Sequence, residues 1–176
     1  DKVGLIMFTD CIERFVPPRK GRKHILRLVR DILVVEPSSQ RTDISTALAF
    51  LNRVQRRRAV IFLISDFHDQ AGVHALKVAA RHHDLLALMV SDPLEQSLPS
   101  IGWVRFEDAE TGEQVLVNTS DKRFRQRFAA LVDQHRQFWR QLFQSAQIDY
   151  VELSTNEPYI IPLWRMFRER HRRFRR

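Results

Sequence analysis

The sequence contains one cysteine and five glycines in 176 residues, and it has no long apolar run. Because Cys11 has no second cysteine to pair with, an internal disulfide is excluded, and a reducing compartment such as the cytoplasm is expected. The longest apolar run covers residues 59–64, far fewer than the ~20 residues that a membrane-spanning helix needs. The scarcity of glycine also leaves few flexible loops for cradling a phosphate group.

The chain also lacks a signal peptide, an internal repeat and a starting methionine. Because the methionine is missing, we expect this chain to be a fragment of a longer protein. Its length predicts that residues 1–176 form one domain. A chain of this length buries roughly two thirds of the surface that it exposes when unfolded. The apolar content of 44% is typical of globular proteins and excludes wholesale disorder.

The excess of positive charge is concentrated at the C-terminal end of the chain. The net charge of +8 suggests nucleic acid or anionic lipid as a partner, but seven arginines lie in residues 165–176, and without them the charge falls to +1. Nucleic acid is disfavoured because only Phe167 and Phe174 are interleaved, too few for a stacking platform. An anionic membrane surface remains a possible partner, worth about 1 kcal/mol per basic residue. The expected contacts are Arg168, Arg172, Arg173, Arg175 and Arg176.

Hydrophobic patterning predicts an α/β fold. Short apolar runs predict buried strands at residues 3–8, 59–65, 85–90 and 149–153, and alternation predicts a half-exposed edge strand at 12–16, ended by Pro17-Pro18. Residues 103–107 and 114–118 flank a turn signal and predict a hairpin. Helical periodicity covers residues 21–33, 44–54, 70–81, 121–146 and 159–170. Alternating buried strands and helices indicate a mainly parallel sheet that is covered by helices on both faces.

Two of these helices have apolar faces that predict how they pack. In the helix at 21–33 the predicted buried face is Ile25, Leu28, Val29 and Ile32. In the helix at 121–146 a stripe steps by four and three residues along Phe124, Phe128, Leu131, His135, Phe138 and Leu142.

Two polar positions stand where ligand sites are built in parallel α/β proteins. Thr42 precedes a predicted helix, and Asp66 ends a predicted strand. A hydroxyl and a carboxylate together suit a hard cation such as Mg²⁺. Plainer interpretations stay open, because Thr42 and Asp66 are also ordinary cap and turn residues, and Asp43 is first of all a helix N-cap. Asp43 and Asp69 are nearby acids with weaker claims to a metal.

The chain resembles a von Willebrand factor A-like domain, in particular the bacterial group filed as domain of unknown function 58. The resemblance is carried by Arg41-Thr42-Asp43, Ala47-Leu48 and Ile64-Ser65-Asp66. Further matches cover nearly the whole chain: Asp1-Lys2-Val3-Gly4-Leu5, Pro17-Pro18-Arg19-Lys20-Gly21-Arg22, His83-Asp84, Asp92-Pro93-Leu94-Glu95 and Asn118-Thr119-Ser120-Asp121.

This resemblance implies a Rossmann-like, three-layer α/β fold, with a mainly parallel sheet, an antiparallel edge strand and helices on both faces. It also implies a metal-ion-dependent adhesion site that holds Mg²⁺ at the upper edge of the sheet. In such sites an Asp-x-Ser-x-Ser loop supplies three ligands, and Thr42 and Asp66 match the threonine and the aspartate that complete the set. No Asp-x-Ser-x-Ser occurs in these 176 residues. We expect it before Asp1, on a central strand and a helix that the fragment lacks. The intact parent is thus expected to bind Mg²⁺, and this fragment is not.

The resemblance also implies a non-enzymatic protein–protein interaction domain. The expected partner is a MoxR-type AAA+ ATPase presenting an acidic residue, in an assembly or chaperone-like role, with membrane association through segments outside this fragment. Two alternatives remain. Asp10, Asp66 and Asp92 each follow an apolar strand, as in a Mg²⁺-dependent phosphoesterase. A basic nucleic-acid-binding module is the other alternative.

Overall fold

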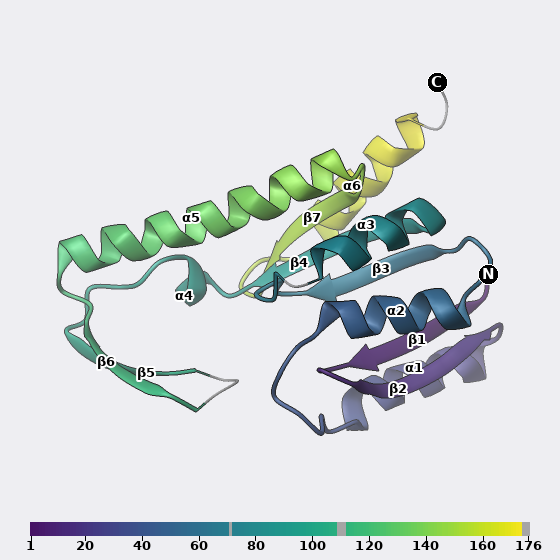
Figure 1. Ribbon diagram of the computed structural model, residues 1–176, viewed down its shortest axis with the longest axis horizontal. Coiled ribbons are helices and arrows are strands. Elements are labelled where there is room, and N and C mark those ends of the chain that lie inside the picture. Colours follow the sequence, from purple (N-terminus) through teal and green to yellow (C-terminus); the bar gives the residue numbers. More distant parts are fainter. Residues whose placement is uncertain (71, 109–111, 174–176) are drawn as a thin grey trace. The chain divides into compact units, whose positions relative to one another are not determined.

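A computed structural model describes residues 1–70, 72–108 and 112–173 (Figure 1). The chain divides into two compact units. The first comprises Asp1–Arg58 and Asp69–His82, and the second comprises Ala59–His68, His83–Asp108 and the chain from Gly112 onward. Each unit has its own sheet and helices, and each is described by itself below.

The first unit contains a two-stranded antiparallel sheet of β1 (Val3–Phe8) and β2 (Ile12–Arg19). The prediction that Pro17-Pro18 ends the second strand is wrong. The register shifts between the Val3–Arg19 pair and the Leu5–Val16 pair, so both prolines fall within an irregularity where no ladder N–H is required. β1 was expected to be buried, yet none of its residues is, and Val3 is 44% exposed.

Helix α1 (Arg22–Val34) follows the predicted range but packs by a different face. Of the four predicted face residues only Leu28 is buried, while Ile25 and Ile32 are each about half exposed. The second buried residue is Asp31, whose carboxylate pairs with Arg14 of β2 at 3.2 Å. A charge pair with β2 therefore orients α1, which hydrophobic periodicity does not reveal.

Helix α2 (Ile44–Val54) matches its predicted range, and its face of Ile44, Ala47, Leu48 and Leu51 is buried. It packs against α3 (Val73–His82), which begins three residues later than predicted. A Cβ added to Gly72, just before α3, would lie 2.9 Å from Cβ of Ile44, so only glycine permits this approach.

The second unit is built on a parallel sheet in the order β3 (Val60–Ser65), β4 (Asp84–Ser91) and β7 (Asp149–Ser154). Five successive residues of β4, Leu85–Met89, are buried, as expected for the middle strand of a parallel sheet. Together with the helices of both units, this sheet confirms the predicted α/β class.

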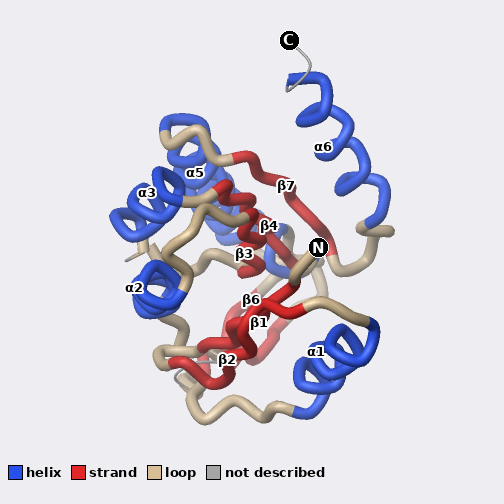
Figure 2. The backbone as a smooth tube through the Cα atoms, turned by 90° about the vertical axis from the view of Figure 1, so that its right-hand side faces the viewer, coloured by secondary structure: helices blue, strands red, loops and turns tan. Residues whose placement is uncertain are grey.

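Helices cover this sheet on opposite faces (Figure 2). Successive residues of β7 point to opposite sides, so Asp149 and Tyr150 mark the two faces. Tyr150 contacts Phe143 of α5 (Lys122–Ser145), with ring centroids 5.3 Å apart. Asp149 binds Arg170 of α6 (Ile160–Arg173) at 2.7 Å. Helix α5 therefore lies on one face and α6 on the other, as in a Rossmann-like fold.

The stripe predicted for α5 is only partly correct. Leu142 is buried, but Leu131 is 64% exposed, and the largest buried side chains of the helix are Trp139 and Phe143. Only the C-terminal half of α5 contributes these buried side chains, so a stripe along the whole helix overstates its buried length. The predicted hairpin is confirmed as β5 (Trp103–Glu107) and β6 (Gln114–Asn118), although its turn residues 109–111 lie outside the described residues. Short helix α4 (Pro93–Gln96) was not predicted.

Within the residues that the structure describes, no helix combines the length and apolarity needed to cross a membrane.

Candidate functional site

Asp66 stands at the carboxyl end of β3, in a loop that the core holds in place. The next residue, Phe67, is fully buried, and its ring centroid lies 5.0 Å from that of Trp139 and 5.3 Å from that of Phe143. Its backbone φ of 60° is uncommon for a residue with a side chain. The Ser65 hydroxyl accepts a hydrogen bond from the Phe67 N–H at 3.0 Å. The aromatic core thus maintains a strained turn directly beside Asp66.

The Asp66 carboxylate is itself only lightly engaged. Oδ1 accepts a hydrogen bond from the His68 N–H at 3.2 Å, as in an Asx turn. A longer bond of 3.4 Å from the Ser65 hydroxyl reaches the same oxygen. Among the described residues, Oδ2 takes part in neither of these two bonds.

Asp43 is the N-cap of α2, as predicted. Oδ1 accepts hydrogen bonds from the Ser45 and Thr46 N–H groups at 2.8 and 3.3 Å, and Oδ2 accepts one from the Thr46 hydroxyl at 2.7 Å. The Thr46 hydroxyl is the main reason that the pKa of Asp43 lies below its usual value. Both oxygens serve the cap, so Asp43 is a poor candidate for metal ligation.

Thr42 immediately precedes this cap. The Asp43 N–H donates a hydrogen bond to the carbonyl of Thr9, the residue after β1, at 3.0 Å, and this bond ties the start of α2 to the end of β1. Thr42 and Asp69 belong to the first unit and Asp66 to the second. Among the described residues, no group of three or more His, Cys, Asp or Glu side chains is placed to hold a metal. Hydroxyl and carboxylate oxygens fit the chemistry of Mg²⁺, but two such ligands fall short of its near-octahedral requirement.

Asp92, one of the three carboxylates that suggested a phosphoesterase, has a structural role. It caps α4 by accepting from the Leu94 N–H at 2.9 Å, and Glu95 accepts from the Asp92 N–H in return. Its second oxygen accepts from the Thr155 hydroxyl at 2.8 Å. The Leu94 N–H and then Thr155 hold the pKa of Asp92 below its usual value.

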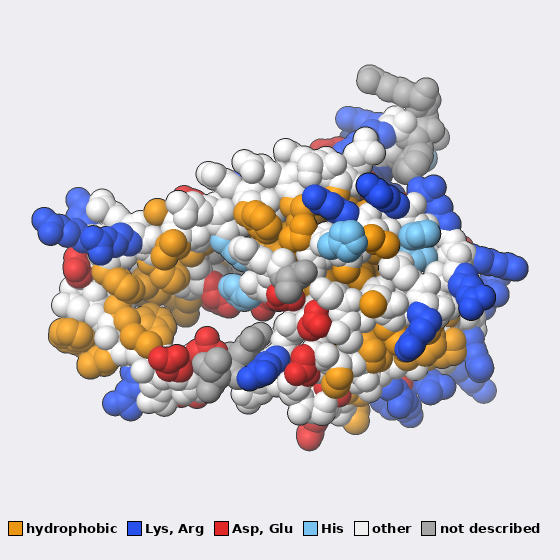
Figure 3. All heavy atoms as spheres, in the orientation of Figure 1, with side chains coloured by type: hydrophobic (Ala, Val, Ile, Leu, Met, Phe, Trp, Pro, Cys, Tyr) orange, Lys and Arg blue, Asp and Glu red, His pale blue; other side chains and the backbone are white. Residues whose placement is uncertain are grey.

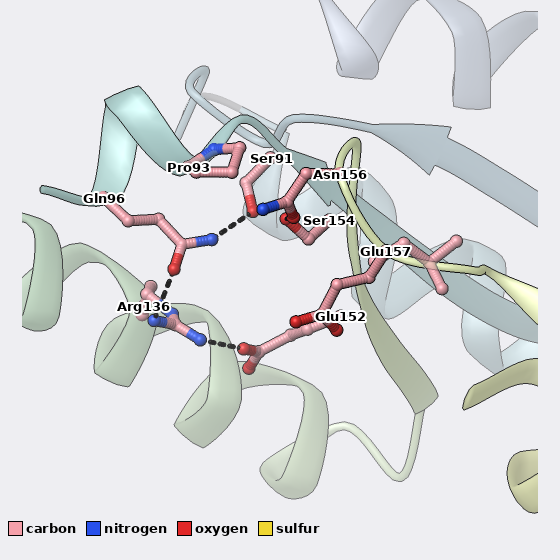
Figure 4. Close-up of a pocket in the computed structure, with 9 residues that line it drawn as sticks. Ser91, Pro93, Gln96, Arg136, Glu152, Ser154, Asn156 and Glu157 are labelled. Carbon is pink, nitrogen blue, oxygen red and sulfur yellow. Dashed lines mark hydrogen bonds and ion pairs between the residues drawn. The ribbon is translucent and has the colours of Figure 1, made fainter. Parts of the chain in front are cut away.

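A polar pocket that was not predicted lies at the carboxyl ends of β4 and β7, with a cavity volume of about 380 Å³ (Figure 4). The terminal residues of the two strands, Ser91 and Ser154, are neighbours in the sheet. The Gln96 side chain reaches across from α4 and donates to the Ser91 hydroxyl at 2.7 Å. Arg136 of α5 contacts Gln96 and the Glu152 carboxylate (Figure 4).

Glu152 is shared between two arginines. Arg140 donates two hydrogen bonds to its oxygens, at 2.6 and 3.0 Å, and Arg136 donates another. Burial raises the pKa of Glu152, but the arginine hydrogen bonds outweigh it, so the pKa lies below its usual value. These residues fix α5 on β7. The sequence signal was a pair of arginines spaced by one helical turn, Arg136 and Arg140, and an acid, Glu152, within the predicted strand at 149–153.

The arginines of the C-terminal helix divide into two groups. Arg170 is buried and binds Asp84 at 2.5 Å and Asp149 at 2.7 Å, and Arg173 also binds Asp149 at 2.7 Å. Arg168 instead lies over the exposed ring of Trp164, 4.5 Å from its centroid. Of the predicted surface contacts, Arg173 is therefore tied to the sheet, while Arg175 and Arg176 lie outside the described residues.

Large apolar side chains are also exposed in the second unit. Figure 3 shows such side chains gathered over the β5–β6 hairpin and the nearby part of α5. Trp103 and Leu116 of the hairpin are 68% and 60% exposed. A second set lies on β3 and α6 and includes Ile64 and Trp164, at 61% and 58%. Surfaces of this kind mark interaction sites more often than isolated apolar residues do.

Comparison with known proteins finds relatives without an assigned function. The chain is 34% identical over 160 residues to an uncharacterized Mycobacterium avium protein, covering 89% of this chain and 94% of that protein. It is 29% identical over 175 residues to the uncharacterized protein Rv1480 of Mycobacterium tuberculosis, covering 98% of this chain. The chain spans 55% of that relative's length. No solved structure matches.

The family model described as "Protein of unknown function DUF58" matches residues 1–138, well over half of the chain. The chain therefore belongs to the DUF58 family of proteins of unknown function.

Proposed function

We propose that this chain is part of a non-enzymatic protein–protein interaction domain of von Willebrand factor A-like type. Its intact form holds Mg²⁺ with Thr42, Asp66 and ligands from an Asp-x-Ser-x-Ser loop outside these 176 residues. The metal supplies an open coordination position that an acidic residue of a partner protein occupies. The residues of this chain orient two of the ligands.

One observation carries this proposal: the turn that presents Asp66 is held by the core. Phe67 is fully buried in a left-handed backbone conformation, and it packs against Trp139 and Phe143. Strained backbone conformations cluster at functional sites, so the strain at Phe67 supports a functional role for the neighbouring Asp66. The Asp66 carboxylate beside it keeps one oxygen outside the Asx turn. This is how a ligand would be fixed at the carboxyl edge of a parallel sheet.

The partner that fits this role is a MoxR-type AAA+ ATPase in an assembly or chaperone-like process. The family resemblance supports this choice, and the site chemistry requires only that the partner offer a carboxylate. Of the residues expected to contact an anionic membrane surface, Arg168 and Arg172 are exposed on α6.

The test uses the intact protein and measures Mg²⁺ binding and partner binding by calorimetry. Thr42→Ala combined with Asp66→Asn should abolish both, and EDTA should abolish partner binding to the unchanged protein. Asp133→Asn, an exposed acid on α5, serves as the matched control and should change neither. Undiminished partner affinity in EDTA would refute the proposal.

The 176-residue chain alone should bind Mg²⁺ far more weakly than the intact protein, since it supplies two ligands. Equal affinity in the two forms would show that the site lies elsewhere.

A further inference from the structure

On one face of β3, three apolar side chains are about half exposed to solvent. The register pairs Val60 with Asp84 and Phe62 with Leu86, so these β3 side chains lie on the same sheet face as α6. On that face Val60, Phe62 and Ile64 are 57%, 46% and 61% exposed. On the opposite face Leu63 is only 5% exposed. Strands of parallel sheets are normally covered on both faces, but within the described ranges 1–70, 72–108 and 112–173 these three side chains are not covered in this way.

Helix α6 lies on the same sheet face, beside the exposed side chains of β3. Met166 and Arg170 of α6 are buried toward the sheet, and Arg170 is held by Asp84. Phe167 meets Phe62 edge to face, with ring centroids 6.1 Å apart. Trp164, one turn earlier, is 58% exposed. We name the surface with β3 as its floor and α6 as its wall the β3–α6 groove.

The rim of the β3–α6 groove is positively charged. Arg168, His171 and Arg172 line a hollow of about 600 Å³ together with Trp164 and Phe167. Arg168 stacks over the Trp164 ring at 4.5 Å, which places its charge beside the apolar surface. A second copy of the chain would bring the same positive charges to the same rim. Charge complementarity therefore favours an occupant that carries carboxylates next to an apolar stripe.

We propose that the β3–α6 groove binds an amphipathic helix of a protein partner. Its apolar stripe rests on Phe62 and Trp164, and its acidic residues meet Arg168 and Arg172. A helix suits this surface because helices pack about 10 Å from a sheet face and 8–10 Å from a neighbouring helix, filling the corner between β3 and α6.

The inference builds on the proposed interaction role but does not involve the metal site. The probe is a labelled amphipathic peptide of about 18 residues, roughly five helical turns, with leucines along one stripe and glutamates beside it. A second peptide has lysine in place of every glutamate, and a third has the acidic composition in scrambled order. Fluorescence anisotropy measures binding to the 176-residue chain.

The acidic helix should bind, and the lysine and scrambled peptides should bind at least about tenfold more weakly, because two ion pairs become repulsions or lose their register. The double variant Arg168→Glu/Arg172→Glu should exchange the preference and bind the lysine peptide instead. The matched control Lys122→Glu/Arg123→Glu, at the exposed start of α5, should bind as the unchanged chain does. Binding should be the same in EDTA, which separates this test from that of the metal site.

Equal binding of the acidic and lysine peptides, or no effect of the Arg168→Glu/Arg172→Glu change, would overturn the proposal. So would a dimer in sedimentation that Phe62→Lys converts to monomer, since a second copy would then fill the groove. Binding to vesicles of mixed phosphatidylglycerol and phosphatidylcholine that is lost with Trp164→Ala would replace the helix by a membrane surface.

Discussion

Arg170 is the residue on which the seating of α6 depends, and its removal gives the sharpest test of the fold. Its side chain is 11% exposed, and the guanidinium binds Asp84 at 2.5 Å and Asp149 at 2.7 Å. These attachments hold the pKa of Arg170 above its usual value, first through the hydrogen bond to Asp84. Arg170→Ala leaves two partly buried carboxylates facing each other across neighbouring strands.

The expected loss follows from the exposure of the partners. Removing one member of a fully buried ion pair costs about 3–5 kcal/mol. Asp84 and Asp149 are 31% and 23% exposed, so water compensates part of the loss. Asp149 also keeps its bond to Arg173. We expect Arg170→Ala to lower the free energy of unfolding by about 2 kcal/mol.

Urea denaturation followed by circular dichroism measures this change. With a denaturant slope of about 2 kcal/mol/M, the midpoint should fall by roughly 1 M. Arg173→Ala is the matched control, because Arg173 binds the same Asp149 but is 66% exposed, and it should cost under about 0.5 kcal/mol. If both variants unfold at the same urea concentration, α6 is not held by the Arg170 pairs, and the reasoning fails.

Three further predictions concern the first unit. Asp43→Ala should destabilise the protein by about 1 kcal/mol through loss of the α2 cap, whereas Asp43→Asn should keep most of the stability that the cap provides. Thermal denaturation of both variants measures the difference. Gly72→Ala should cost about 1–3 kcal/mol, since the new Cβ meets Ile44 at 2.9 Å; an unchanged midpoint would contradict that contact. Hydrogen bonds from Ser38 lower the pKa of Glu13 from 4.5 to about 2. The ionised Glu13 carboxylate therefore stabilises the fold fully above pH 4.5, and this stabilisation is lost as pH falls toward 2. Glu13→Gln should remove this part of the pH dependence of the free energy of unfolding, measured by urea denaturation at a series of pH values.

The sequence predicted elements best where local signals agreed. Helix α2 has a cap residue, Asp43, directly before a regular apolar face, and its range was predicted correctly. The hairpin strands have β-forming residues on both sides of a turn signal, and both ranges are correct. In each case the decisive interactions lie within a few residues of one another.

The errors arose where distant residues decide the structure. Pro17 and Pro18 remain in β2 because the register against β1 shifts opposite them, which no local signal reports. Helix α1 buries Asp31 because its carboxylate forms an ion pair with Arg14 of β2. The pocket at β4 and β7 depends on Arg136 meeting Glu152 from another element. Charge pairs of this kind follow from the fold and leave little trace in hydrophobic periodicity.

The two proposals meet on one strand. Val60, Phe62 and Ile64 share a face of β3, and by strand alternation Asp66 continues their series just beyond the strand end. Phe67 continues the other series, and it is buried against Trp139 of α5. A helix lying in the β3–α6 groove would therefore run toward the end of β3 that presents Asp66. If one partner supplies both the helix and the metal-bound carboxylate, Phe62→Lys and Asp66→Asn should weaken its binding by less together than the sum of their separate effects.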